Sequence, residues 1–154
     1  MTPYENVKKL ILARKPSMRW DGTESAEAWQ FRSREKLAEL IGLDEMMPAE
    51  KSIEIEYDRA GEGFREIRLH FQSEPDYFIP CHLLIPDGAD HPLPTVICLQ
   101  GHSKGMHISL ERVKYPDEQI NGDRDFALRA VKEGFCALAL EQRDFGECGG
   151  NEKD

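Results

Sequence analysis

One short segment of the chain, residues 99–105, contains the residue types that acyl transfer uses. Gly101, Ser103 and Gly105 fit the pattern G-x-S-x-G, in which a serine on a sharp turn attacks a carbonyl carbon. That serine needs a histidine as its general base, and the motif places an acidic residue and then the histidine later in the chain. Because His107 is the only histidine after Ser103, this order cannot be completed within the sequence. Ser103 with His107 as its base therefore remains an unusual alternative.

The same loop fits the other half of this chemistry better, because it offers backbone N–H groups. Acyl transfer develops negative charge on the carbonyl oxygen, and fixed backbone donors stabilise that charge. The two glycines let the loop bend and let a substrate approach the backbone. We therefore predict an oxyanion-binding loop at Gly101 and His102, with the backbone N–H of His102 as a donor. A plain turn without a catalytic role and a His102 imidazole that acts as a base are the alternatives.

The sequence around this loop indicates the parallel part of a sheet. Residues 96–99 and 135–140 are continuously apolar, which is typical of parallel strands that are covered on both faces. Residues 123–133 between them have the spacing of a helix, and Gly134 ends it. This pattern predicts a right-handed strand–helix–strand crossover. It places the loop at the carboxyl end of a strand, where open α/β sheets bind ligands.

An earlier group of predicted strands has a different pattern. These strands cover residues 53–57, 67–71 and 77–85, and apolar and polar side chains alternate along the first two. Such alternation is typical of antiparallel strands with one face in water. We therefore expect acidic side chains such as Glu54 and Glu66 to lie on a solvated face.

Two predicted helices precede these strands. Thr2 and Glu5 form a capping box around Pro3, which predicts a helix start, and Pro16 ends this helix. Apolar residues at helical spacing predict a second helix over residues 24–41.

The composition excludes several classes of function. The chain has 154 residues, of which 40% are hydrophobic and 32% charged, as is typical of one globular domain. Its net charge of -9 repels phosphate backbones and anionic lipids, so we expect no nucleic-acid partner and no membrane partner. No apolar run is long enough to span a bilayer, and residues 1–15 do not resemble a signal peptide. A cytoplasmic location is therefore expected.

The sequence indicates no metal and no other cofactor. The cysteines form no CxxC pair and mostly lie in apolar runs, so we expect reduced thiols and no zinc site. They are Cys81, Cys98, Cys136 and Cys148. His107 with Asp117 or Asp123 fits no standard spacing of metal ligands. His70 and His82, at alternate positions on predicted strands, are expected to be structural.

Three segments of the chain resemble a known family. Residues 79–86, 93–102 and 141–150 are similar to the N-terminal half of the α/β-hydrolase family. They most resemble its acetyl-xylan-esterase-like and dienelactone-hydrolase-like branches, and the last segment is similar to the family's run Asp-x-Arg-Gly-x-Gly-x-Ser-x-Gly. The resemblance covers residues 77–150, and the helical N-terminal extension also resembles the esterase-like members.

Three residues depart from the family's pattern. Gln100 stands where the His-Gly oxyanion motif has a histidine, Asp144 stands in place of a glycine, and Cys148 in place of a serine. The resemblance gives Arg143 and Asp144 a structural, bracing role beside the site. In this role Arg143 would pair with a carboxylate such as Asp144 or Glu141.

The resemblance implies an α/β fold: the N-terminal part of an α/β-hydrolase sheet, in which antiparallel strands lead into parallel strands. Residues 1–45 would form a helical extension and residues 46–154 an incomplete hydrolase domain, within a single domain overall. In the family, the serine elbow follows the fifth strand and the acid and base come later, so all three would lie outside this chain. Because the fifth strand lies beside the third, residues 95–99 would form an open sheet edge, which is an association hazard.

From these observations we expect the N-terminal portion of an esterase-type serine hydrolase, which cleaves carboxylic esters by acyl transfer. The chain would supply the oxyanion loop and lack the triad, so it would be inactive alone. Whether the chain is itself an enzyme is left open. The expected partner of the complete protein is a small-molecule ester. The alternative is a non-catalytic hydrolase-like protein that acts in binding or self-association through the open edge. A complementary chain segment or a second copy would then cover that edge.

Overall fold

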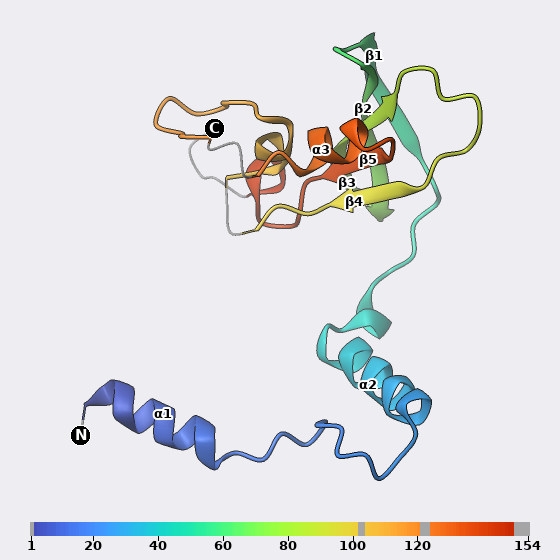
Figure 1. Cartoon of the computed structure of the whole chain (residues 1–154). Coiled ribbons are helices and arrows are strands. Elements are labelled where there is room, and N and C mark those ends of the chain that lie inside the picture. The colour runs from blue at the N-terminus through green and yellow to red at the C-terminus, as the bar shows by residue number, and fades with distance from the viewer. Residues whose placement is uncertain (1, 102–103, 121–123, 150–154) are drawn as a thin grey trace. The chain divides into compact units, whose positions relative to one another are not determined.

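The computed structural model describes residues 2–101, 104–120 and 124–149. The contacts within the chain divide it into two units, Met1–Met46 and Met47–Asp154, of which the first is helical and the second holds the sheet (Figure 1). No helix in the described residues is long and apolar enough to cross a membrane.

The first unit consists of helices with well-defined starts. Helix α1 spans Pro3–Ala13, α2 spans Ala26–Leu40, and the short 3₁₀ helix η1 spans Leu43–Glu45. The predicted capping box is confirmed, since the Thr2 hydroxyl accepts from the Glu5 N–H at 3.2 Å and the Glu5 carboxylate accepts from the Thr2 N–H at 2.7 Å. Neither α1 nor α2 contains a buried residue.

The second unit is built on a five-stranded mixed sheet. Its strands are β1 (Ile53–Ala60), β2 (Phe64–Glu74), β3 (Tyr77–Pro86), β4 (Thr95–Cys98) and β5 (Cys136–Leu140). Their order in space is β1-β2-β3-β5-β4. The first three strands and β5 pair in antiparallel fashion, and β4 and β5 pair in parallel. The predicted change from antiparallel to parallel strands is therefore confirmed.

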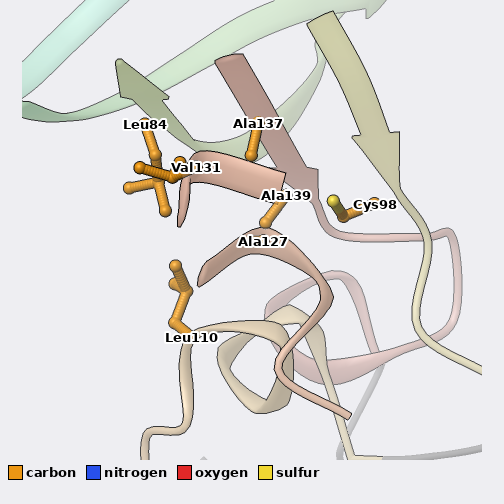
Figure 2. Packing of buried hydrophobic residues seen from close by; sticks show 7 residues of the cluster. All are labelled: Leu84, Cys98, Leu110, Ala127, Val131, Ala137 and Ala139. Atoms are coloured by element: carbon orange, nitrogen blue, oxygen red, sulfur yellow. The ribbon is translucent and has the colours of Figure 1, made fainter. Parts of the chain in front are cut away.

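Helix α3 (Phe126–Lys132) joins the two parallel strands and lies against the sheet (Figure 1). It is shorter than the predicted helix over residues 123–133. Figure 2 shows side chains of α3 gathered with side chains of β3, β4 and β5. The buried cluster comprises Leu84, Cys98, Leu110, Ala127, Val131, Ala137 and Ala139. Three alanines in this cluster keep the helix close to the strands, so small changes of volume there will be felt.

Strand β4 lies at one end of the sheet, as the resemblance implied. Among the described strands it pairs only with β5. Its apolar side chains are partly uncovered, and Ile97 is 60% exposed. A short apolar strand with a free edge is a template for pairing with another chain.

The polar face of β2 and β3 is buried, which corrects the prediction for Glu66, whereas Glu54 on β1 is exposed as predicted. Glu66, Arg68 and His82 are 2%, 5% and 7% exposed. The alternation of apolar and polar residues predicts the strands correctly. It does not predict that segments later in the chain cover the polar face of β2 and β3. Arg112 and Glu147 reach it from the segments that follow β4 and β5.

Candidate active site

The predicted oxyanion loop follows β4, and a second loop follows the neighbouring strand β5. The two loops start side by side, because β4 and β5 run parallel. Gly101 is exposed, and a Cβ atom added to it would meet no described atom within 4 Å. His102 and Ser103 lie outside the described residues, so the donor role of the first and the nucleophile role of the second stay predictions.

A buried carboxylate stands where these two loops meet. Glu141, at the end of β5, is 1% exposed. Its Oε1 atom accepts a hydrogen bond from Gln100 Nε2 at 2.7 Å and another from the Met106 backbone N–H at 3.0 Å. Its Oε2 atom accepts from the Glu147 backbone N–H at 3.3 Å. Burial raises the pKa of Glu141, and the two backbone N–H groups only partly oppose this rise.

Two glycines let the loops close on this carboxylate. A Cβ atom at Gly146 would lie 2.2 Å from Glu141 Oε2, and one at Gly105 would lie 3.0 Å from the same atom. Both glycines have a positive φ, +46° at Gly146 and +147° at Gly105, which side chains rarely adopt. Glycine is therefore required at both positions by the backbone and by the close approach.

Gln100 replaces the family's histidine without leaving the loop unsupported. Its side chain is buried and donates to Glu141, and its backbone carbonyl accepts from the Gln142 side chain. Its Oε1 atom has no hydrogen-bond partner among the described residues.

His107 pairs with a carboxylate, which accounts for its burial. Its Nε2 atom lies 2.8 and 2.9 Å from the two carboxylate oxygens of Glu118. Burial alone would raise the pKa of Glu118, but the Lys114 N–H and the His107 ring outweigh this effect, and the pKa lies below its usual value. Asp117 binds Lys104 instead, and Asp123 lies outside the described residues. The described part of the chain holds no cluster of three or more metal-ligand residues.

A second buried cluster lies on the polar face of β2 and β3. His82 Nδ1 is 2.7 Å from Glu66 Oε1, and Arg68 Nη1 is 3.1 Å from His82 Nε2. Because a guanidinium can only donate, Nε2 must accept, so the neutral ring carries its proton on Nδ1 and donates it to Glu66. Arg112 binds both Glu66 oxygens at 2.7 Å, and Arg59 binds one of them.

The environment of this cluster shifts two pKa values downward. Burial would raise the pKa of Glu66, but the guanidinium groups of Arg112 and Arg59 outweigh it and lower the value to about 2. Burial is the main cause that lowers the pKa of His82 to about 4, and Arg68 and Arg112 add to it. At neutral pH the carboxylate is therefore charged and the imidazole is neutral.

The structure corrects the predicted partner of Arg143. Its guanidinium binds Glu74 and lies 4.2 Å from the centre of the Tyr77 ring, and it is not paired with Asp144 or Glu141. Asp144 has a φ of +65°, so the aspartate occupies a left-handed turn where the resembling run has a glycine. Its bracing role stays a prediction.

Sequence reasoning named neither Glu141 nor the Glu66 cluster as part of the site. Glu141 was singled out only as a partner for Arg143, because its position after an apolar strand gives no hint of the three donors around it. The nearest signal is the pair Gly105 and Gly146, whose lack of side chains makes room for the carboxylate.

Comparisons with known proteins give a family and, among several matching solved structures, a neighbour with the same fold. Residues 3–154 match the model of the Abhydrolase family. The fold matches the crystal structure of a putative acetyl xylan esterase from Bacteroides fragilis with a TM-score of 0.74 and 22% sequence identity. The match covers 97% of this chain and 39% of that chain, so the chain spans about two fifths of its neighbour's length. No curated protein matches the sequence.

Proposed function

The chain belongs to the Abhydrolase family, and from this premise we propose that it is the N-terminal part of an esterase that cleaves carboxylic esters by acyl transfer. In this proposal the loop after β4 binds the carbonyl oxygen of the substrate. The backbone N–H of His102 donates to the oxyanion, and the substrate approaches over Gly101. The reacting serine, acid and base belong to sequence outside these 154 residues.

One observation carries the proposal. Gly101 lies just beyond the apolar strand β4, is exposed, and has no described atom within 4 Å of the place where a Cβ atom would be. An acyl group needs this access to reach backbone donors, and the carboxyl ends of β4 and β5 are where ligands of open α/β sheets bind. The exposure of Gly101 favours a binding loop over a plain tight turn that is closed to the substrate.

A pair of substitutions at one position tests the donor role. In the complete esterase, made from the reading frame that contains this chain, we expect His102→Pro to lower kcat on p-nitrophenyl acetate by about 10²–10³-fold, because proline has no N–H. His102→Ala keeps the N–H and removes only the imidazole, so we expect nearly unchanged kcat. If alanine is as harmful as proline, the imidazole acts and the backbone donor is wrong.

The chain by itself gives a second test. We expect no hydrolysis of p-nitrophenyl acetate above the buffer rate by the purified chain of 154 residues, and the same result for Ser103→Ala. Hydrolysis by the chain that disappears in Ser103→Ala would make Ser103 the nucleophile. Absence of ester hydrolysis by the complete protein would end the esterase proposal.

A second function, binding or self-association, is favoured by the open edge at β4. Here a second copy of the chain or a complementary segment would pair with β4. If two copies meet there, Ile97→Lys should shift the sedimenting species from dimer to monomer, because edge lysines block strand pairing. Ile55→Lys on β1, which is 62% exposed at the other end of the sheet, is the matched control. A monomeric wild-type chain, or equal effects of both substitutions, would refute pairing at β4.

A further inference from the structure

Glu141 is held in an unusual way for a buried carboxylate. Across residues 2–101, 104–120 and 124–149, no lysine or arginine forms an ion pair with it. Its partners are one amide side chain and two backbone N–H groups. Of the nearby charged groups, Glu147 raises its pKa and His107 lowers it. Burying an unpaired carboxylate costs free energy, so its presence needs a reason other than stability.

The positions of its donors supply that reason. Gln100 and Met106 stand on either side of residues 101–105, and both donate to the same oxygen, Oε1. The ends of the predicted oxyanion loop are therefore fixed at one point. The other oxygen accepts from Glu147, whose own carboxylate binds Arg68 and Lys114.

Only a carboxylate satisfies these three donors. Each oxygen of a carboxylate accepts hydrogen bonds and donates none, which suits three N–H groups that converge on it. A glutamine at position 141 would present one acceptor oxygen and one NH₂ group, and the NH₂ group would face a donor. With its oxygen in the place of Oε1, the glutamine keeps the bonds from Gln100 and Met106 and loses only the one from Glu147. Glu141→Ala, which removes both oxygens, therefore tests the attachment of the loop, and Glu141→Gln is its control.

We propose that Glu141 is a positioning residue for the oxyanion loop: by binding Gln100 and Met106 at one oxygen, it fixes both ends of the loop to which the proposed function assigns the oxyanion donor. This inference rests on the proposed function of that loop. Glu141 does not touch the reacting atoms and acts through the loop that it holds. Preorganised donors stabilise a developing charge better than donors that must first reorient.

Hydrogen exchange in the full chain tests the attachment without any need for activity. In Glu141→Ala we expect the amides of residues 100–106 to exchange about tenfold faster or more, while those of β2 and β3 keep their rates. Glu141→Gln should leave the exchange of residues 100–106 nearly unchanged, because it keeps one acceptor oxygen. Leu84→Ala is the control, since it opens a fully buried position of the core and should raise exchange throughout the sheet unit. A merely structural role of Glu141 predicts the same general rise in Glu141→Ala, and that result, or unchanged exchange in the loop of Glu141→Ala, would overturn the inference.

Kinetics of the complete esterase give the second readout. We expect Glu141→Ala to lower kcat on p-nitrophenyl acetate about tenfold or more with little change in KM, because the loop acts on the transition state, and Glu141→Gln to keep kcat near that of the wild type. Faster exchange confined to the loop with wild-type kcat would also overturn the positioning role. If the complete wild-type protein hydrolyses no ester, the proposed function fails, and the exchange result alone then decides whether Glu141 holds the loop.

Discussion

Acidification from pH 7 to pH 4 should lower the free energy of unfolding of the sheet unit by about 3 kcal/mol, and His82 should account for most of the loss. The buried ring has a pKa of about 4, whereas a histidine in the unfolded chain titrates near 6.5. Between these values the unfolded chain binds a proton that the folded chain does not, so stability falls as the pH falls. Glu66, with a pKa of about 2 in the folded chain, acts in the same direction between about pH 4.5 and 2.

Urea unfolding followed by circular dichroism at pH 7, 5.5 and 4 measures this loss. Circular dichroism is the suitable signal because both tryptophans, Trp20 and Trp29, lie in the first unit and the sheet lies in the second. His82→Gln removes the titrating ring and should flatten the dependence between pH 6.5 and 5. Glu141 has a raised pKa and works in the opposite direction, so it cannot produce the loss. A wild-type stability that is constant from pH 7 to 4 would contradict the prediction.

Gly146→Ala should destabilise the sheet unit by about 3 kcal/mol or more. A left-handed backbone costs an alanine about 1–2 kcal/mol, and the new Cβ atom would also displace the Glu141 carboxylate from buried donors. Each buried donor left without a partner costs about 1–3 kcal/mol. Gly88→Ala is the control for the backbone alone, because Gly88 has a φ of +75° and no described atom within 4 Å of an added Cβ.

A double-mutant cycle separates the contact from the backbone strain. In a Glu141→Ala background the carboxylate is gone, so Gly146→Ala should cost no more than Gly88→Ala. Urea unfolding of the four chains gives the coupling energy between the two positions. Additive effects of Gly146→Ala and Glu141→Ala would mean that Gly146 does not make room for the carboxylate.

The sequence predicts the elements of this fold well where the pattern is local. The apolar runs at β4 and β5, the alternation along β1 and β2, and the capping box at Thr2 each arise from neighbouring residues, and the structure confirms them. The α/β-hydrolase resemblance is likewise confirmed by the family match and the shared fold. Alternation cannot reveal which face other segments will cover, because Arg112 meets Glu66 from 46 residues away.

The sequence predicts a place for the candidate site, but it does not predict the contacts that support the loop there. The glycines and the position after an apolar strand identified the loop at Gly101. The donors of Glu141 lie up to 41 residues away from it in the chain, so no local pattern reports them. Arg143 shows the same limit, since its partner Glu74 lies on a strand 69 residues earlier. Long-range pairing between charged side chains is the part of the structure that one sequence does not reveal.

The strand order has a consequence for folding during synthesis on the ribosome. Strands β1, β2 and β3 follow one another in the chain and are neighbours in the sheet, so each can pair with the one before it, whereas β4 pairs only with the later strand β5 among the described strands. Thr95 pairs with Cys136, so β4 must wait until the long segment that contains α3 has been synthesised. During this interval the apolar strand β4 has no pairing partner. The nascent chain is then most exposed to chaperone binding and to mispairing.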